Sequence, residues 1–586
     1  MLPRGLTGEV HETRGDFEPT RLYRTTFNPR LSMSQRMQGQ PMVILGEDSQ
    51  RMQDKDAQSH NISAARAVAE SVRSTLGPKG MDKMLVSSTG DVTVTNDGVT
   101  ILREMDIDNP TAEMIVEVAE TQEDEAGDGT TSAVSISGEL LKNAEDLLEQ
   151  DIHPSTVIKG FDMAAKEARS QIDDVAEEVS VDDREVLKQV AETAMTGKGA
   201  EQNKDLLGEL IVDAVENVTV EAEDGTSVVD LEFLDITTEA SGTAADSELV
   251  EGVLLTEDPV HEDMPTDFED AEVLLMDTAL EIEEANADAQ LSVDDPSQLQ
   301  QFVEQEEQQL EEMVETIADA GVDVVFCQKN IDDMVQHMLA KEGILAVKRA
   351  KKSDIEFMRE VLDANIVSDL DNFSGADLGS GDVTYDADNE WFVVEGDNSH
   401  GVTLLLRGST DHVVDELERG VNDALDVVAA AVADGLVLAG GGAVEVELAS
   451  RLRDYADGIS GREQLAIEAF ADSLELIPRV LAANAGLDSI DTLVELRSAH
   501  EDGDQNAGLN VFTGDIEDTY EAGVVETAHA KSQALSSAAE AANLVLKIDD
   551  IIAAGDLSTS GGDEEGAGGP GAGGMGGMGG GMGGMM

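Results

Sequence analysis

Residues 127–134 read GDGTTSAV and combine a glycine-rich turn with the start of a predicted helix. Gly127 and Gly129 let the backbone approach a ligand closely. Three hydroxyl side chains follow that can bond to such a ligand: Thr130, Thr131 and Ser132. The helix that begins there adds free N–H groups and the positive end of its dipole, and both favour phosphate. The stretch therefore predicts a phosphate-binding turn, in which the carboxylate of Asp128 can hold Mg²⁺.

Three further glycine-rich turns occur in the chain: LGPKG (76–80), Asp97-Gly98 and Gly440–Gly442. None is a Walker P-loop, because GxxxxGK[ST] does not occur in the sequence. Taken singly, each turn has a structural explanation. Asp97 can be a simple turn former, and Gly440–Gly442 can be a break between helices. Their combination in one chain favours a nucleotide site.

The segments around these turns show both helical and extended patterns. Apolar residues at helical spacing predict helices over Asn61–Leu76, Thr111–Glu125 and Thr130–Leu148. In Asp91–Leu102, two β-branched runs flank Asn96-Asp97-Gly98 and predict a hairpin. Residues 183–250 mix helix and turn, and the chain is mainly helical again from about Val402 to Ala554.

The middle of the chain, residues 252–399, has a different texture. Short apolar strands such as Ala271–Met276 and Val322–Cys327 alternate with helical segments, which indicates α/β organisation. Asp294-Asp295-Pro296 is a helix start. The helix after it has an apolar face: Leu299, Phe302, Val303, Leu310, Met313, Val314 and Ile317. This face either packs on its own domain or belongs to a projecting element that closes over something.

The composition indicates a folded, acidic, multidomain chain. Its 586 residues exceed the size at which one hydrophobic core keeps growing, which predicts two to four domains. Hydrophobic residues make up 41% and aromatic residues only 3%, which favours helix-rich packing. The 124 acidic and 37 basic residues give a net charge of −87. That charge argues against nucleic acid or anionic lipid as a partner, and its even spread predicts adaptation to a salty cytoplasm.

Cys327, the one cysteine, cannot form an intrachain disulfide and is predicted to be a small core residue. No apolar run is long enough to span a membrane, and the first residues contain no hydrophobic stretch typical of a signal peptide. A cytoplasmic location is therefore expected. Residues 1–32 carry more arginine than the rest and are interpreted as an extension that is either disordered or the product of a misassigned start codon. The Gly/Met-rich segment 556–586 is predicted to be a flexible tail.

Several longer segments resemble the group II chaperonins of the archaeal thermosome type, which are related to the eukaryotic cytosolic chaperonin. The resemblance extends from about Met33 to about residue 555. Its segments are LGPKGMDKML (76–85), TNDGVTIL (95–102), GDGTTSAV (127–134), FCQKNIDD (326–333), GGGAVEVELA (440–449), SGREQLAIEAFADSLELIPRVLAANAG (460–486) and LKIDDIIAA (546–554).

The resemblance implies a multidomain α+β chaperonin fold. A mainly helical equatorial ATPase domain would comprise residues 33–182 and 441–555. A small intermediate hinge domain would comprise 183–251 and 404–440. An α/β apical domain, 252–403, would be inserted within it and would bind non-native protein. The helix over about 295–320 would be the helical protrusion that forms a built-in lid.

The resemblance also implies roles for particular residues. Asp97 and Asp423 match the acidic residues assigned to hydrolysis, and Asp128 would bind Mg²⁺. The nucleotide would contact Leu76, Gly77, Pro78, Gly98, Gly129, Thr130, Thr131, Ser132, Gly197, Lys198, Gly441, Gly508 and Glu526. Glu526 would hold the ribose, although the surrounding GVVETAHAK departs from the family's usual VVEP- or VVDP-type sequence.

The function implied is an ATP-dependent chaperone that encloses non-native proteins and promotes their folding, with ATP and Mg²⁺ as ligands and K⁺ as a further candidate ion. Like subunits, of one type or several, would form two stacked rings of eight or nine without a separate lid protein. Two alternatives stay open. One is a small-molecule kinase or synthetase that uses the same loops, and the other is an ATP-binding scaffold without folding activity.

Overall fold

The computed structural model describes residues 50–53, 55–87, 90, 92–105, 107–198, 200–221, 227–282, 296–387, 389–396 and 401–553. The predicted extension 1–32 and the predicted tail 556–586 lie outside these residues. So do the side chains of Leu299, Phe302 and Val303. The described elements bury three large hydrophobic cores, and each core is built from its own stretches of sequence.

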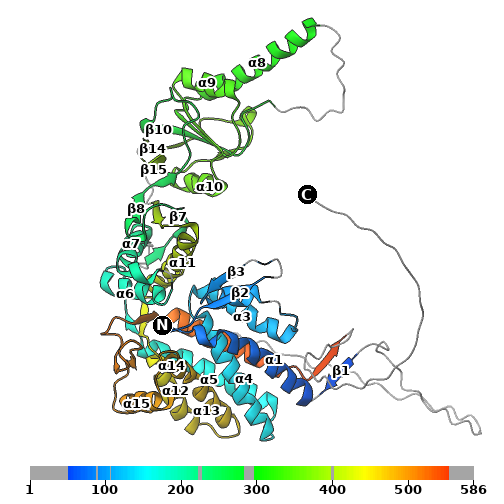
Figure 1. The fold of residues 1–586 in the computed structure, drawn as a ribbon, viewed down its shortest axis with the longest axis vertical. Coiled ribbons are helices and arrows are strands. Elements are labelled where there is room, and N and C mark those ends of the chain that lie inside the picture. The colour runs from blue at the N-terminus through cyan, green and yellow to red at the C-terminus, as the bar shows by residue number, and fades with distance from the viewer. Residues whose placement is uncertain are drawn as a thin grey trace, which may run out of the picture. The chain divides into compact units, whose positions relative to one another are not determined.

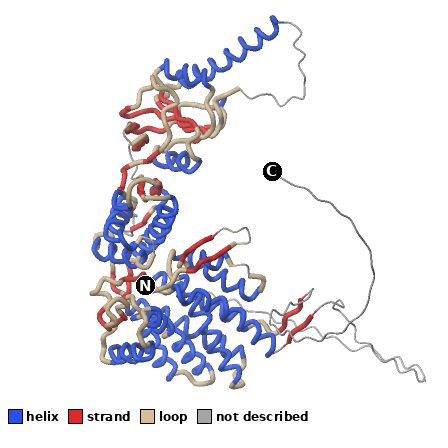
Figure 2. The backbone as a smooth tube through the Cα atoms, in the orientation of Figure 1, coloured by secondary structure: helices blue, strands red, loops and turns tan. Residues whose placement is uncertain are grey.

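The first core is made of helices from both ends of the chain (Figures 1 and 2). Its N-terminal helices are α1 (Lys55–Val72), α2 (Gly98–Glu104), α3 (Pro110–Ala126), α4 (Thr130–Glu149) and α5 (Pro154–Val175). Its C-terminal helices are α12 (Ala443–Asp457), α13 (Glu463–Leu474), α14 (Leu476–Asn484) and α16 (Ala528–Leu546), and α15 (Ser489–Glu501) packs on α14 and α12 without contributing to this core. Helix α4 contacts α1, α16 and α13, and most of its residues are buried. The two chain ends therefore fold as one helical body.

The second core lies between a mixed sheet and its helices. The seven-stranded sheet has the order β12-β11-β10-β14-β15-β9, with β13 paired to β10. Strands β10, β11, β12 and β13 run parallel, and β14, β15 and β9 are antiparallel. The strands are β9 (Val253–Leu255), β10 (Asp267–Met276), β11 (Val324–Cys327), β12 (Leu345–Lys348), β13 (Ile366–Val367), β14 (Gly379–Asp386) and β15 (Trp391–Gly396). The α/β organisation predicted for this region is confirmed.

Three helices belong to this second body: α8 (Pro296–Asp319), α9 (Asp333–Glu342) and α10 (Lys352–Val361). In the C-terminal half of α8, Leu310, Val314 and Ile317 are buried in the second core. That half of the helix therefore packs on its own domain, which is one of the two interpretations that the sequence left open. Cys327 is fully buried on β11, as predicted.

The third core lies between three helices and a three-stranded sheet. The helices are α6 (Arg184–Met195), α7 (Lys204–Asn217) and α11 (Asp411–Asp434). The strands are β7 (Leu234–Glu239), β8 (Glu248–Glu251) and β16 (Val402–Arg407), in the order β7-β16-β8. A hairpin of β5 (Thr219–Glu221) and β6 (Ser227–Val229) follows α7. Helix α11 contacts α6 and α7 of this body, and it also touches α16 and α3 of the first core.

Short strands connect these bodies close to the glycine-rich turns. Strand β17 (Leu436–Ala439) pairs with β4 (Glu177–Glu178) and with β20 (Val525–Thr527), which joins segments from both ends of the chain. Strands β18 (Ala507–Leu509) and β19 (Ile516–Asp518) form a separate hairpin. The remaining strands are β1 (Gln50–Gln53), β2 (Lys83–Val86), β3 (Val92–Thr95) and β21 (Asp550–Ala553).

The hairpin predicted around Asn96-Asp97-Gly98 is wrong. Strand β3 pairs with the preceding strand β2, and helix α2 starts immediately at Gly98. The carboxylate of Asp97 accepts a hydrogen bond from the backbone N–H of Thr100 at 2.7 Å, so Asp97 is the N-cap of that helix. The apolar run after it, including Ile101 and Leu102, is buried at helical spacing in the first core. Burial of this face outweighs the β propensity of its residues.

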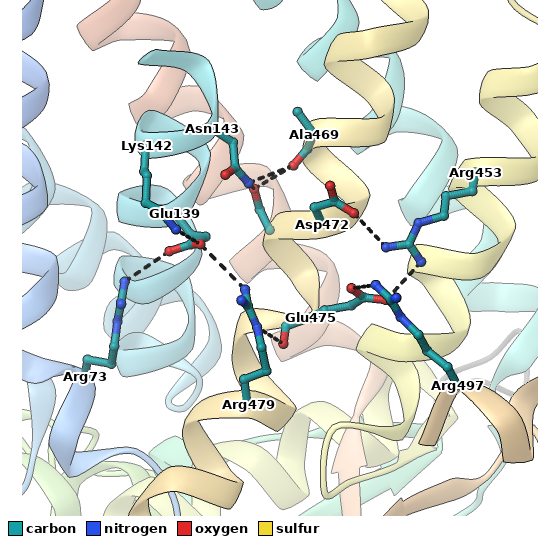
Figure 3. A network of polar contacts seen from close by, with 11 residues as sticks. Arg73, Glu139, Lys142, Asn143, Arg453, Ala469, Asp472, Glu475, Arg479 and Arg497 are labelled. Carbon is teal, nitrogen blue, oxygen red and sulfur yellow. Dashed lines mark hydrogen bonds and ion pairs between the residues drawn. The ribbon is translucent and has the colours of Figure 1, made fainter. Parts of the chain in front are cut away.

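Two buried carboxylates hold arginines between helices of the first core (Figure 3). Glu139 on α4 pairs with Lys142 at 2.6 Å and with Arg73 and Arg479 at 3.5 Å each. Glu475, which precedes α14, pairs with Arg497 and with Arg453. Both glutamates are at most 3% exposed. A buried carboxylate is stable only when it is paired in this way, so these contacts fix how the helices pack.

Within the described part of the chain, no helix has the length and apolar character needed to cross a membrane.

Candidate nucleotide site

A cavity of about 670 Å³ brings the glycine-rich turns together. Its walls come from α2, α3, α4, α6, α11, α14, α16 and the β18–β20 region. All residues that the sequence analysis singled out for the site line this cavity except Gly508. The cavity thus gathers segments from residues 75–132, 185–205, 423–441 and 477–534. A volume of this size lies within the range of small-molecule sites in proteins.

Gly508 lies behind the wall, on β18. A Cβ atom at this position would be only 2.6 Å from the carbonyl oxygen of Gly440. The next residue, Leu509, donates its N–H to the carbonyl of Gly441 at 2.9 Å. Gly508 therefore allows the strand to support the Gly440–Gly442 turn from behind, and it is Gly441 and Leu509 that line the cavity.

The first turn of α4 forms one end of the cavity. Gly127 and Gly129 adopt left-handed conformations with φ of 63° and 83°. Gly129 is the N-cap of α4 and has no side chain with which to accept from the helix N–H groups. These N–H groups belong to Thr130, Thr131 and Ser132, which line the cavity. An uncapped helix start of this kind is suited to an anion.

Lys198 and Asp423 meet at the same end of the cavity. The Lys198 Nζ lies 2.5 Å from Asp423 Oδ2. Burial alone would lower the pKa of Lys198, but the carboxylates of Asp423, Asp128 and Asp97 outweigh it and raise that pKa above its usual value. Burial raises the pKa of Asp423, and the ammonium of Lys198 opposes this rise. The ion pair therefore keeps a cation and a carboxylate together in a largely desolvated place.

Two hydrogen bonds fix the turn that carries Asp97. One is the capping bond from Asp97 to Thr100. In the other, the Asn96 side chain donates to the carbonyl of Gly197 at 2.5 Å. The second bond ties this turn to the loop of Lys198, which lies next to Gly197. Asn96 was not among the predicted site residues, although it stands beside Asp97 in the sequence.

Glu123 is a further acidic residue of the cavity that the sequence analysis missed. It lies in the last turns of α3 and accepts a hydrogen bond from Thr130 Oγ1 at 2.9 Å. Burial, followed by the nearby carboxylates of Asp423 and Asp97, raises the pKa of Glu123 to about 7. The side chain is therefore partly protonated near neutral pH. A chain with 124 acidic residues offers no sequence signal that would distinguish this one.

Another part of the cavity wall is more apolar. Leu76, Ile477, Leu481, Leu509 and Val511 line it together with Pro78 and the exposed ring of Phe512. The Lys79 ammonium lies 4.6 Å from the centroid of the Phe512 ring. Apolar side chains and an aromatic face of this kind suit a planar heterocyclic ring.

Glu526 also lines the cavity, and its closest partner is Lys531, which the sequence analysis did not name. Lys531 pairs as well with the buried Glu445 at 2.6 Å. Among the described residues, no group of three or more His, Cys, Asp or Glu side chains has the arrangement of a preformed metal site. Asp128, within the glycine-rich turn, offers one carboxylate to a cation, and Mg²⁺ would complete its shell with water or phosphate oxygens.

Comparison with known proteins shows which family this chain resembles. The pattern of the TCP-1/cpn60 chaperonin family matches residues 68–556. The chain is 69% identical over 539 residues to thermosome subunit 2 of Haloferax volcanii, which covers 92% of this chain and 97% of that protein. It is 68% identical over 536 residues to thermosome subunit beta of Halobacterium salinarum, which covers 91% and 96%.

Thermosome subunit 1 of Haloferax volcanii is 56% identical to the chain over 543 residues, covering 92% of this chain and 96% of that protein. Among solved structures, the chain resembles the open-state monomer of a group II chaperonin from Methanococcoides burtonii. The TM-score is 0.60 at 42% sequence identity, and the match covers 72% of this chain and all of the other.

Proposed function

The chain belongs to the TCP-1/cpn60 chaperonin family and is a group II chaperonin subunit of the thermosome type, and on this basis we propose that its cavity binds ATP and hydrolyses it to drive protein folding. The observation that supports the proposal best is the Lys198–Asp423 ion pair, which lines the same cavity as the uncapped first turn of α4. A cation, carboxylates and free N–H groups within one cavity are what a phosphoryl-transfer site needs.

The phosphates of ATP would bind at the first turn of α4. The N–H groups and hydroxyls of Thr130, Thr131 and Ser132 are the donors there, and the left-handed Gly129 removes any competing cap. Gly98 borders the same region, since a Cβ at Gly98 would lie 2.6 Å from Thr131 Oγ1. Lys198 and the adjacent Gly197 would face the terminal phosphate. Mg²⁺ held by Asp128 would neutralise phosphate charge, and K⁺ is a candidate for a further ion.

The adenosine end would lie against the apolar wall. Leu76, Gly77 and Pro78 would contact the base, opposite Leu509 and Phe512. Gly441 and Glu526 would approach the ribose. At Gly77 a Cβ would be 2.3 Å from Leu481 Cδ2, so a larger residue there would close this end of the cavity.

Asp423 and Asp97 would orient and activate the attacking water. A carboxylate whose pKa is raised by burial accepts a proton more readily than an exposed one, and Asp423 has this property. Lys198 fixes the position of the Asp423 carboxylate and compensates its charge. Because α11 carries Asp423 and packs on α6 and α7 in the third core, movement of that body would insert or withdraw the residue.

The assembly proposed is a double ring of eight or nine subunits that encloses non-native proteins in the cytoplasm. The two Haloferax volcanii relatives bear different subunit numbers, which supports rings of more than one subunit type. Helix α8 would be the built-in lid, so no separate lid protein is needed. The C-terminal half of α8 packs on the second core and would anchor that lid.

Two measurements test this function. Electron microscopy of protein purified in high salt, with and without ATP, should show a double ring that closes with ATP. A monomer or dimer would instead support a small-molecule kinase or synthetase. Refolding of a denatured protein should require ATP and fail with ADP. Equal recovery with both nucleotides would indicate an ATP-binding scaffold without folding activity.

A further inference from the structure

Glu526, Lys531 and Glu445 form a triad that comes from three elements around the Gly440–Gly442 turn. Glu526 lies in β20, where it pairs in register with Leu438 of β17. Lys531 is in the first turn of α16, and Glu445 is in the first turn of α12. Glu526 and Lys531 line the cavity, whereas Glu445 lies behind them and is only 4% exposed.

The ammonium of Lys531 joins the two carboxylates. It bonds Glu445 Oε1 at 2.6 Å and also contacts Glu526 Oε2. A cation in the first turn of a helix is disfavoured by the helix dipole, so α16 itself gains nothing from Lys531. Burial would lower the pKa of Lys531, but Glu445 and Glu526 raise it, which keeps the side chain charged. The two glutamates are therefore what holds this lysine in place.

The triad gives the two oxygens of Glu526 different surroundings. Oε2 is taken up by Lys531. Oε1 packs against the backbone of Gly440. A Cβ atom added to this glycine would lie only 2.9 Å from Oε1. The lysine thus fixes the rotation of the Glu526 carboxylate and leaves Oε1 outside the ion pair.

The triad also has an unbalanced charge and an unsatisfied atom. One ammonium faces two carboxylates, and the second oxygen of Glu445, Oε2, is buried with no hydrogen-bond partner among the residues that the structure describes. A buried arrangement of this kind lowers the stability of the fold, so its presence beside the cavity points to a functional role. Replacing Lys531 by a neutral residue would leave both carboxylates unpaired and free to rotate.

We propose that Lys531, anchored by Glu445, is a positioning residue that holds Glu526 for the vicinal hydroxyls of a ribose and so makes the cavity selective for ribonucleotides over deoxyribonucleotides. This inference rests on the proposed ATP site. A site that is built to bond a hydroxyl discriminates against the analogue that lacks it, because its own polar group is then left unpaired. Fixing the acceptor in advance increases that discrimination.

The experiment compares kcat/KM for ATP with that for 2′-deoxyATP and 3′-deoxyATP in the assembled protein. The wild type is expected to prefer ATP by about tenfold or more. Lys531→Gln should bring this ratio close to one, with KM for ATP raised about tenfold and kcat within about twofold of wild type. Lys547→Gln is the matched control, because Lys547 is an exposed lysine at the C-cap of the same helix. It should retain the wild-type ratio.

Glu445→Gln provides a second test that leaves Lys531 and Glu526 paired. It should reduce the ratio about threefold, and it decides the question if Lys531→Gln does not assemble. A wild-type ratio in either assembled variant overturns the inference. So does a wild type that hydrolyses ATP and deoxyATP equally well, and in that case the proposed ATPase stands. A wild type that neither binds nor hydrolyses ATP contradicts the proposed function itself.

Discussion

The ammonium of Lys198 lies 2.5 Å from the carboxylate of Asp423, although 225 positions separate the two residues in the chain. Lys198 belongs to the loop after α6, and Asp423 lies in the middle of α11. Asp97 and Asp128, from the first core, contribute further negative charge at the same point. The geometry of the proposed catalytic end therefore depends on how α11 lies against the glycine-rich turns.

Asp423→Asn is expected to bind ATP and to turn it over slowly. The amide keeps the size of the side chain but is a poor proton acceptor, so kcat should fall about 100-fold while the dissociation constant for ATP changes little. Steady-state hydrolysis and calorimetric binding give the two quantities. Asp415→Asn, an exposed acid on the same helix, is the control. Turnover within twofold of wild type in Asp423→Asn would remove this residue from the active site.

Glu123→Gln is expected to change how stability depends on pH. Burial and the carboxylates of Asp423 and Asp97 raise the pKa of Glu123 from 4.5 to about 7. The folded state therefore binds a proton more tightly than the unfolded state does. This contribution to stability is fully present below pH 4.5 and is lost as the pH rises through about 7. It amounts to roughly 3 kcal/mol at most, before discounting for solvent screening.

Thermal unfolding of the nucleotide-free protein at fixed concentration tests this. Between pH 5 and pH 8 the wild type should lose more stability than Glu123→Gln, and at pH 8 the variant should be the more stable of the two. Glu117→Gln removes an exposed charge from the same helix and should follow the wild type. Parallel curves for wild type and Glu123→Gln would contradict the assignment.

Gly127→Ala is expected to impair hydrolysis through α11. A Cβ at this left-handed position would lie 2.6 Å from the Cβ of Asp426, which is one turn beyond Asp423 on α11. Relief of the collision displaces Asp423, and a shift of about 1 Å can cost up to about 100-fold in rate. Gly503→Ala introduces a side chain at another positive φ with nothing within 4 Å. Gly503→Ala should cost about 1 kcal/mol of stability and leave kcat unchanged. An equal loss of kcat in both variants would rule out the collision with Asp426.

Glu475→Gln is expected to destabilise the first core by about 1–3 kcal/mol, because it removes the buried carboxylate that Arg453 and Arg497 share, while both arginines are still partly exposed to solvent. Burial would raise the pKa of Glu475, but the bonds from Arg497 and Arg453 lower it. Its contribution is therefore present above the unfolded value of 4.5 and disappears as the pH falls below it.

The control for Glu475→Gln is Asp151, an acid that is itself largely exposed and whose partner Lys55 is largely exposed too. Lys55 and Asp151 are 75% and 89% exposed, so Asp151→Asn should change stability by less than about 0.5 kcal/mol. Molar salt screens the exposed pair and leaves most of the Glu475 effect in place. Unfolding curves at low and high salt separate the two cases. A Glu475→Gln effect that vanishes in salt would show that the pair is not desolvated.

Much of the fold could be predicted from the sequence because the chain repeats strong local signals. Helix α3 is observed at Pro110–Ala126 where Thr111–Glu125 was predicted, and α4 at Thr130–Glu149 where Thr130–Leu148 was predicted. Helix α3 starts at Asn109-Pro110 and ends at Gly127, and α4 starts after Gly129 and ends at the polar Gln150. The segment around Asp97 failed because Asn-Asp-Gly is compatible with a turn and with a helix cap, and only burial of the following face decides between them.

The place of the α4 turn in the cavity could be predicted, because glycines and hydroxyls at a helix start have a direct physical meaning. Glu123 and Lys531 were not, because their importance comes from partners that lie far away in the sequence or from burial. For Lys531 there was one unused signal. A lysine five positions after Glu526, in a chain with only 37 basic residues, is rare enough to suggest a specific partner.

The division of the first core between the two ends of the chain has a consequence for biosynthesis. Its N-terminal helices leave the ribosome long before α12–α16, and about 270 residues separate the two groups. At typical rates of translation that interval lasts on the order of 10–50 s. The second core, whose residues all lie between Val253 and Val394, can close during this time. The cavity is complete only after α16 emerges, so a nascent chain of this protein closes its second core before the proposed ATP site is formed.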